Sequence, residues 1–534
     1  MTPSLEHLIG QKLLWSFHGQ AAPPEFMNAV RRGHVGGVTL FRSLNVDSPA
    51  QIRELTERLQ ATARQAGRPP LLIAVDQEGG QLMALGDATT PFPGNMALGA
   101  TRSAELARRV GFAIGRELAA LGVNVNYAPV ADVNLNPHNP VIGTRAFGEA
   151  PDLVATLSAA LGRGLQAAGV AATAKHFPGH GDTAGDSHHG TPVVTHDMET
   201  LRRIDLPPFQ AAIEAGVRLI LTAHVAVPAL DDQPDRPATL SARILRGVLR
   251  NELKFEGVIV TDALDMRAIS QGAELYVDAI CAALAGADVL LLTSFLDQPG
   301  IYATLLQAAR RGLLPMTELE ASAARIATLK QWLAAQPAPP SFDVVGCAAH
   351  HTLAAEVARQ SITLVRDDAR LLPIRLPPDA QLAVIVPRPI DLTPADTSSY
   401  VAPTLAQAAR AFHARVNDLI APHDPSASDI AAICDQVRDC DLILIGTLNA
   451  YSTAGQAALV NEVLRLGVPV VVAALRLPYD LTVFPAAPTY VCTYSVLQPS
   501  MRALAQALWG EAPFRGRLPV TIPDLYPRDH GLIG

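Results

Sequence analysis

The chain has 534 residues, of which 49% are hydrophobic and 17% are charged, and its formal net charge is −8. This length suggests two or more domains, and the composition is that of a globular protein rather than a disordered one. The charge is only mildly acidic and no run of four or more Lys or Arg residues occurs, so we expect neither a nucleic acid nor a membrane surface as a partner. A small-molecule or oligosaccharide substrate is the expected partner, and no oligomeric state is predicted.

The N-terminal residues, the apolar runs and the cysteines indicate the cellular compartment. The first residues, 1–7, lack a basic start followed by an apolar run, and no stretch approaches the ~18 uninterrupted apolar residues of a membrane span. The five cysteines are odd in number and widely spaced, which favours reduced thiols over disulfides. We therefore expect a cytoplasmic enzyme.

Short apolar runs alternate with amphipathic segments over residues 12–332. The apolar runs are 12–17, 35–41, 71–75, 123–127, 170–174, 219–222, 257–261 and 287–292. The amphipathic segments, with apolar residues at three- and four-residue spacing, are 49–66, 103–120, 152–167, 198–215, 241–251, 266–285 and 317–332. Strands buried on both faces that alternate with helices indicate a parallel sheet, and eight repeats fit a closed (β/α)8 barrel.

Polar residues follow these predicted strands, where the chemistry of a (β/α)8 barrel is found. In chain order they are His18, Arg42, the segment 76–80 (DQEGG), the segment 126–132, Lys175 with His176, His224, and Asp262. They follow the first seven strands and should converge on one rim. The sequence therefore predicts an active site at the carboxyl ends of the strands.

A second α/β pattern follows the proline-rich segment 336–341 (QPAPPS), because prolines cannot continue the preceding helix. Its predicted strands are 361–365, 382–386, 442–445, 468–474 and 489–493, and its predicted helices are 428–437, 454–466 and 501–509. This pattern is typical of a smaller open sheet with helices on its faces. We predict a barrel domain at 1–335, a linker at 336–345 and an α/β domain at 346–534.

The segment 174–188 (AKHFPGHGDTAGDSH) follows the fifth predicted strand and alternates basic, acidic and imidazole groups with Gly and Pro. Asp186 and His188 are two residues apart, so the carboxylate can hold one imidazole nitrogen and leave the other facing a substrate. Such a pair can act as an oriented general acid/base near neutral pH. The alternative is that these histidines only cap the loop or pair with buried polar groups.

The best partner for this acid/base is Asp262, at the end of the apolar run 257–261. A carboxylate there can attack a substrate or stabilise a developing cation. The alternative is an N-cap for the following helix, a role for which Asp265 is better suited. An oriented acid and a separate carboxylate are the parts of a retaining glycosidase, with histidine in place of the usual second carboxylic acid. Asp76 and Arg145 would then bind sugar hydroxyls.

The segment 175–183 (KHFPGHGDT), followed by Asp186-Ser187-His188, resembles the signature of the β-N-acetylglucosaminidase branch of glycoside hydrolase family 3. Supporting matches are DQEGG at 76–80, APVADV at 128–133, NPVIGTRAFG at 139–148, TAH at 222–224, VTDAL at 260–264, SITLV at 361–365 and LLP at 371–373. The resemblance therefore covers nearly the whole chain, in the two-domain form of the family.

The resemblance implies a role for each matching residue. Asp262 would be the nucleophile, His188 the acid/base and Asp186 the residue that orients it. The residues that would hold a terminal N-acetylglucosamine are Asp76, Arg145, Lys175 and His176. It implies release of non-reducing terminal β-N-acetylglucosamine, plausibly from peptidoglycan fragments, with neither a cofactor nor a metal. The family commonly has arginines shortly after DQEGG, where this chain has Gln81 and Ala84, so a sugar contact is either missing or supplied from elsewhere.

Three alternatives remain open. The first is another activity of the same family, a β-glucosidase or a phosphorylase that uses phosphate in place of water. The second is a metal-dependent hydrolase, for which the candidate ligands are His176, His180, His188 and His189. The third is a sugar-binding protein without activity, suggested only by Gln81 and Ala84.

Overall fold

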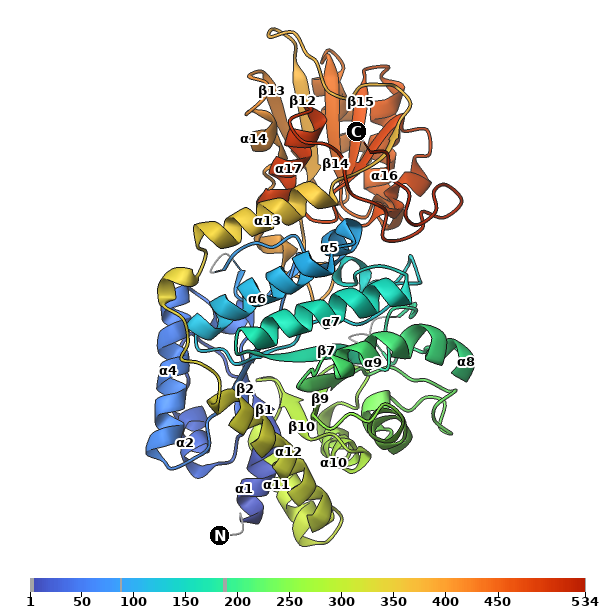
Figure 1. Cartoon of the computed structure of the whole chain (residues 1–534). Helices are drawn as coiled ribbons and strands as arrows, with labels where there is room; N and C mark the ends of the chain where they lie inside the picture. Colours follow the sequence, from blue (N-terminus) through green and yellow to red (C-terminus); the bar gives the residue numbers. More distant parts are fainter. Residues whose placement is uncertain (1–3, 87–88, 186–189, 534) are drawn as a thin grey trace.

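The computed structural model describes residues 4–86, 89–185 and 190–533 (Figure 1). The first part of the chain forms a closed barrel of parallel strands that follow one another around the barrel in chain order. These strands are β1 (Leu13–Trp15), β2 (Gly37–Thr39), β3 (Leu72–Val75), β6 (Val125–Asn126), β7 (Ala171–Phe177), β8 (Leu219–Thr222), β9 (Val258–Ala263) and β10 (Val289–Leu292). Each of the eight predicted apolar runs overlaps one of them, which confirms the predicted barrel.

Helices surround the barrel. They are α1 (Leu5–Gln11), α2 (Pro24–Arg32), α3 (Arg42–Asn45), α4 (Pro49–Gln65), α5 (Asn95–Thr101), α6 (Ala104–Ala120), α7 (Pro151–Ala167), α8 (Met198–Thr200), α9 (Leu206–Glu214), α10 (Leu275–Ala285), α11 (Gln298–Arg310) and α12 (Met316–Ala334). The start of α4 follows the sequence, because the Ser48 side chain accepts a hydrogen bond from the backbone N–H of Gln51 and Pro49 occupies the first helical position.

Three of the predicted helices differ from the structure. The segment 198–215 divides into α8, a π-helical stretch η3 (Leu201–Asp205) and α9, and the segment 241–251 is the π-helical η5 (Arg243–Glu252). The predicted helix 266–285 begins only at Leu275. Gly272 has φ of +67° in the short 3-10 turn before α10, and a left-handed residue cannot continue an α-helix.

The interior of the barrel is filled by apolar side chains from its strands. Leu14, Leu72, Leu219 and others form one buried cluster, and Ile326 and Leu329 of α12 pack against it from the amino-terminal end. This is the packed core expected of a barrel of this kind, not a pore. Ligands must therefore bind at the opposite end, beyond the carboxyl ends of the strands.

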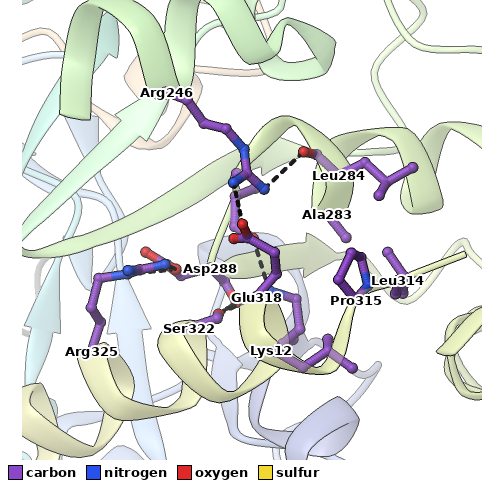
Figure 2. Close-up of a pocket in the computed structure, with 13 residues that line it drawn as sticks. Lys12, Arg246, Ala283, Leu284, Asp288, Leu314, Pro315, Glu318, Ser322 and Arg325 are labelled. Atoms are coloured by element: carbon purple, nitrogen blue, oxygen red, sulfur yellow. Dashed lines mark hydrogen bonds and ion pairs between the residues drawn. The ribbon is translucent and has the colours of Figure 1, made fainter. Parts of the chain in front are cut away.

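Hydrogen bonds and ion pairs also close the amino-terminal end of the barrel (Figure 2). Lys12 Nζ donates to the carbonyl of Ala287 (2.8 Å) and to Ser322 Oγ (2.9 Å), and the buried Asp288 carboxylate pairs with Arg325 (2.8 Å). Burial lowers the pKa of Lys12 to about 8, against the opposing effect of Asp288. The cavity between these side chains is only about 10 Å³, room for a single water. This end of the barrel is structural.

The second part of the chain forms a six-stranded sheet in the order β11-β16-β15-β14-β12-β13. Its strands are β11 (Thr363–Asp367), β12 (Leu382–Pro387), β13 (Val416–Ala421), β14 (Leu442–Thr447), β15 (Val470–Ala474) and β16 (Thr489–Cys492), and its helices are α13 (Ala348–Ser361), α14 (Leu405–Ala409), α15 (Ala427–Val437), α16 (Ala454–Arg465) and α17 (Gln498–Leu508). Strand β11 is antiparallel to β16, and the other pairs are parallel. The predicted second α/β domain is confirmed.

The two domains share a packed boundary. The predicted linker, 336–345, lies between α12 and α13. Helix α5 of the barrel domain places Met96, Ala97 and Ala100 in a core cluster made mostly of second-domain residues, and Figure 1 shows α5 and α13 between the barrel and the second sheet. Among the described residues, no helix is long and apolar enough to cross a membrane.

Candidate active site

The segment after β3 forms a small hairpin at the rim of the barrel, made of β4 (Gln77–Gly79) and β5 (Leu82–Met83). Gly80 lies at its turn with φ of +65°, and a Cβ there would lie 3.0 Å from the Cα of Gly94. The hairpin is tied to β6, because Asn126 Oδ1 accepts from the backbone N–H of Gln77 (3.0 Å). The chain thus fixes the position of the carboxylates of Asp76 and Glu78.

Lys175, in β7, joins these two carboxylates. Its Nζ lies 2.5 Å from Asp76 Oδ1 and 2.6 Å from Glu78 Oε1. Burial alone would lower the pKa of Lys175, but the charges of Asp76 and Glu78 outweigh it and raise that pKa. The side chain of Asp76 is 24% exposed, whereas those of Lys175 and Glu78 are 2% and 0% exposed. Asp76 is therefore the carboxylate of this group that faces the rim.

Arg145 pairs with Glu78 through two hydrogen bonds, from Nη2 (2.8 Å) and from Nε (3.0 Å). Both side chains are buried. Burial by itself would raise the pKa of Glu78, but Arg145 and Lys175 hold it at about 2. Glu78 is thus a buried counter-ion that fixes two cations, and a bidentate pair also fixes the plane of the guanidinium.

His176 continues this network on the other side of Arg145. Its Nδ1 lies 2.7 Å from Asp132 Oδ2, and its Nε2 lies 3.2 Å from Arg145 Nη2. A guanidinium can only donate, so His176 Nε2 accepts from Arg145 and the Nδ1–H of His176 donates a hydrogen bond to Asp132. Burial raises the pKa of Asp132, but the neighbouring His176 more than offsets this and the pKa is lowered.

The loop after β7 is held close to the rim. A Cβ on Gly181 would lie 1.8 Å from the carbonyl oxygen of Val133, so only glycine fits this approach. His180 donates its backbone N–H to Asp132 (2.8 Å). Burial lowers the pKa of the His180 imidazole to about 4, and its Nδ1 lies 2.7 Å from Thr183 Oγ1.

Another histidine, His196, connects the loop residue Asp182 to Asp205 at the end of η3. His196 Nδ1 lies 2.7 Å from Asp205 Oδ2 and its Nε2 lies 3.0 Å from Asp182 Oδ2. The hydrogen bond with Asp205, aided by the charge of Asp182, raises the pKa of His196. Asp186 and His188, the predicted acid/base pair, lie outside the described residues, and their roles stay a prediction.

Asp262 lies at the carboxyl end of β9, directly after Thr261, which is in register with Thr222 of β8. Its Oδ1 accepts from the backbone N–H of Ala263 (2.8 Å). The helix-cap alternative is wrong for both Asp262 and Asp265, because the next helix, α10, begins only at Leu275 and has Glu274 at its N-cap position.

The charges of Asp262 and Asp76 both affect the buried phenol of Tyr127. Burial raises the pKa of the Tyr127 phenol, and the charges of Asp76 and Asp262 both raise it further. The Tyr127 hydroxyl is hydrogen-bonded to Thr39 Oγ1 (2.9 Å) inside the barrel. The predicted nucleophile and a predicted sugar-binding carboxylate therefore both influence the same buried phenol.

The remaining rim residues have supporting contacts. His224 Nε2 lies 3.0 Å from the carbonyl of Ala263, next to Asp262. The His18 ring meets Phe295 edge-on, with centroids 5.2 Å apart. Among the residues that the structure describes, no group of three His, Cys, Asp or Glu side chains is arranged to hold a metal ion, and His188 and His189 of the metal alternative lie outside them.

The structure brings together Asp76, Arg145, Lys175 and His176, which lie in three separate segments of the sequence. Sequence reasoning did not single out Glu78 and Asp132 as site residues, although both lie in segments that follow predicted strands. The available signal was a charged residue at the end of an apolar run. Both are fully buried acceptors, Glu78 for the cations Arg145 and Lys175 and Asp132 for the ring of His176.

The comparisons with known proteins identify the family of the chain. Residues 5–329 match the model of the glycosyl hydrolase family 3 N-terminal domain. The chain belongs to glycosyl hydrolase family 3. It is 35% identical to β-hexosaminidase A of Pseudoalteromonas piscicida, over 94% of this chain and 91% of that protein. It is 31% identical to a β-N-acetylglucosaminidase/β-glucosidase of Cellulomonas fimi, over 93% and 90% of the two chains.

Among solved structures, the family 3 β-N-acetylglucosaminidase of Paenibacillus sp. str. FPU-7 superimposes with a TM-score of 0.92, at 37% identity and covering 98% of this chain and 99% of that one. The resemblance inferred from the KHFPGHGDT motif is therefore confirmed. As a family 3 glycosyl hydrolase, the chain is a glycosidase, and the Paenibacillus structure matches it over both domains.

Proposed function

We propose that this glycosidase is a retaining β-N-acetylglucosaminidase that releases non-reducing terminal N-acetylglucosamine. The observation that carries the proposal is the buried network of Asp76, Glu78, Arg145, Lys175 and His176 at the rim. It occurs in a chain similar over nearly its full length to a solved β-N-acetylglucosaminidase. The network offers several donors and an exposed acceptor to a neutral sugar.

In this proposal the sugar hydroxyls bind to the exposed edge of the network. Asp76 accepts hydrogen bonds from hydroxyl groups, while Lys175 and Arg145 donate to sugar oxygens. Glu78 does not contact the sugar, since its carboxylate is buried and saturated by the two cations. Because the donors are already fixed by Glu78 and Asp132, little side-chain entropy is lost when the sugar binds.

The proposed reaction has two steps. In the first, an Asp262 oxygen attacks the anomeric carbon while His188 gives a proton to the leaving oxygen, so that a glycosyl ester forms and the alcohol departs. In the second, His188 takes a proton from water, the water oxygen bonds to the anomeric carbon and Asp262 is released as a carboxylate. Asp186 orients His188 throughout, so the second domain is not needed for proton transfer.

Peptidoglycan fragments are the proposed natural substrates. A histidine acid/base is neutral once it has given its proton to the leaving group, so it repels an anionic muramyl group less than a second carboxylate would. A β-glucosidase activity is the second candidate, because the Cellulomonas fimi relative carries both activities in its name. A phosphorylase of the same family differs only in the acceptor of the second step.

The test is hydrolysis of matched 4-nitrophenyl β-N-acetylglucosaminide and β-glucoside at pH 7, each with and without a chelator and with and without phosphate. We expect a preference for the N-acetyl sugar that neither chelator nor phosphate changes. A preference for glucose would overturn the sugar assignment. A sugar phosphate as the product would replace hydrolysis by phosphorolysis, and loss of activity with chelator would revive the metal-dependent alternative.

A further inference from the structure

The second domain contacts the rim hairpin through Gln81, which lies between β4 and β5, and through Met83 of β5, whose backbone N–H donates to Thr397 Oγ1 (3.2 Å). The main-chain oxygen of Gln81 accepts from the backbone N–H of Thr397 (2.8 Å) and from its hydroxyl (2.9 Å). The side-chain Oε1 of Gln81 accepts from Arg476 Nη2 (2.7 Å) and from Thr144 Oγ1 (2.7 Å). One carboxamide therefore joins the hairpin, the turn that precedes Arg145, and the second domain.

Arg476 is itself rigidly held. It follows β15 and is 6% exposed, and its Nη1 lies 2.9 Å from Asp396 Oδ2. The other oxygen of Asp396 accepts from the backbone N–H of Ser398 (2.9 Å) and from its hydroxyl (2.6 Å). A planar guanidinium fixed by a buried carboxylate keeps its second edge in one direction, and in this chain that edge faces Gln81.

The two segments joined at Gln81 carry two of the four candidate sugar-binding residues, Asp76 and Arg145. Asp76 and Glu78 lie in the same hairpin as Gln81, and Arg145 directly follows Thr144. The turn at Arg145 is braced a second time, because Asn95 of α5 donates to its carbonyl oxygen (2.7 Å). Helix α5 packs into the core of the second domain, so both supports of this turn come from the same side.

Around Gln81 the two domains are not closely packed. A pocket of about 190 Å³ lies between the domains, lined by Gln81 and residues 138–144 on one side and by Tyr451, Arg476 and others on the other. Where the walls stand apart, directed hydrogen bonds rather than apolar packing must fix the rim segments. Arg476 reaches across to the side-chain carboxamide of Gln81, whereas Thr397 bonds to its main-chain oxygen.

We infer that Arg476 is a positioning residue for sugar binding in the barrel: by holding Gln81 it fixes the hairpin of Asp76 and the turn of Arg145. This inference rests on the proposed function for the identity of the sugar. It also explains how the site can work with Gln81 and Ala84 where the family commonly has arginines. Ala84 is buried and bonded to the main chain of Asp76, and the guanidinium that position 81 lacks comes to it from the second domain.

The test compares Arg476→Met, Gln81→Met and the double variant. The first two should each raise KM, and the inhibition constant of free N-acetylglucosamine, about 10-fold with a smaller change in kcat, which corresponds to about 1.4 kcal/mol of lost binding. The double variant should have the same KM and inhibition constant as the single variants, since both substitutions remove the same contact. Gln81→Met leaves the ion pair of Arg476 with Asp396 intact, so it tests the same contact even if Arg476→Met folds poorly.

Arg109→Met is the matched control. Arg109 of α6 makes another interdomain contact, with Glu356 of α13 (2.9 Å), but it touches none of the rim segments, so KM should stay as in the wild type. Equal KM values for Gln81→Met, Arg476→Met and Arg109→Met would overturn the inference, as would additive effects in the double variant.

The same variants separate this inference from the proposed function. If the wild type prefers β-glucosides, the sugar assignment fails, but KM for the glucoside still reports on Arg476. Amide hydrogen exchange gives a readout without any substrate. Arg476→Met should speed exchange in residues 77–83 and 143–146, whereas Arg109→Met should not. Unchanged exchange in those segments would overturn the inference whatever the sugar.

Discussion

Glu78→Gln is the sharpest single perturbation of the rim. Glutamine has nearly the same shape as glutamate, but it removes the negative charge that holds Arg145 and Lys175. The two cations would then face each other in a buried site, with Asp76 still paired with Lys175 but without the carboxylate that forms hydrogen bonds with Arg145. An uncompensated buried charge is strongly destabilising, so we expect losses of both stability and sugar binding.

The magnitude follows from the pKa of Glu78, which falls from 4.5 to about 2 in the folded protein. A shift of ~2.5 pKa units corresponds to ~3 kcal/mol of stabilisation of the ionised form. With about 2.1 cal/mol/K of unfolding entropy per residue over about 330 residues of the barrel, this lowers Tm by about 4 °C. Because the folded pKa is depressed, the contribution is present above pH ~4.5 and is lost as the pH falls toward 2.

The assay is thermal unfolding of the wild type and Glu78→Gln between pH 7 and pH 3. The difference in Tm should be largest at pH 7 and should shrink below pH ~4.5. Glu105→Gln is the control, since Glu105 pairs with Arg108 on the exposed surface of α6 and its loss should leave Tm unchanged. Equal Tm values for Glu78→Gln and the wild type at pH 7, or a difference that does not change with pH, would refute the reasoning.

Three further predictions concern proton transfer and buried histidine and lysine groups. His188→Ala should lose far less rate on substrates with good leaving groups than on poor ones, and steady-state rates that fall equally on both would count against His188 as the acid. Burial lowers the pKa of Lys330 to about 7, so the wild type should gain stability between pH 7 and pH 10, and urea unfolding should give a smaller gain for Lys330→Met. His196 has a raised pKa, so its link between Asp205 and Asp182 should weaken as the pH rises through that pKa. Hydrogen exchange of residues 191–197 should then speed up in the wild type but show no such dependence in His196→Gln; a dependence retained in the variant would exclude His196 as its source.

The barrel could be predicted from the sequence because its strands are buried on both faces and read as continuous apolar runs. The same signal was absent for β13, an edge strand in which Asn417 and Asp418 are not fully buried, and it was missing for the short hairpin of β4 and β5. The helix predicted from 266 failed because periodicity does not register the backbone conformation of Gly272.

The candidate site was predictable only in part, for a related reason. Asp76, Arg145, Lys175 and His176 follow strands or match a family motif, and so they could be named from local patterns. The role of Gln81 could not be predicted, because its partner Arg476 lies 395 residues away in the chain. Glu78 was likewise overlooked, since its function as a counter-ion depends on two cations that the fold brings to it.

The most direct test of the central proposal is to identify the nucleophile. A 5-fluoro derivative of β-N-acetylglucosaminyl fluoride should accumulate a covalent glycosyl-enzyme, and tryptic digestion places Asp262 in the peptide 255–267 (FEGVIVTDALDMR). This peptide also contains Glu256 and Asp265, so fragment sequencing distinguishes the three carboxylates. We predict that the label lies on Asp262 and is absent from Asp262→Ala. A label on another carboxylate, or no label on an enzyme that hydrolyses the N-acetylglucosaminide, would contradict the proposal.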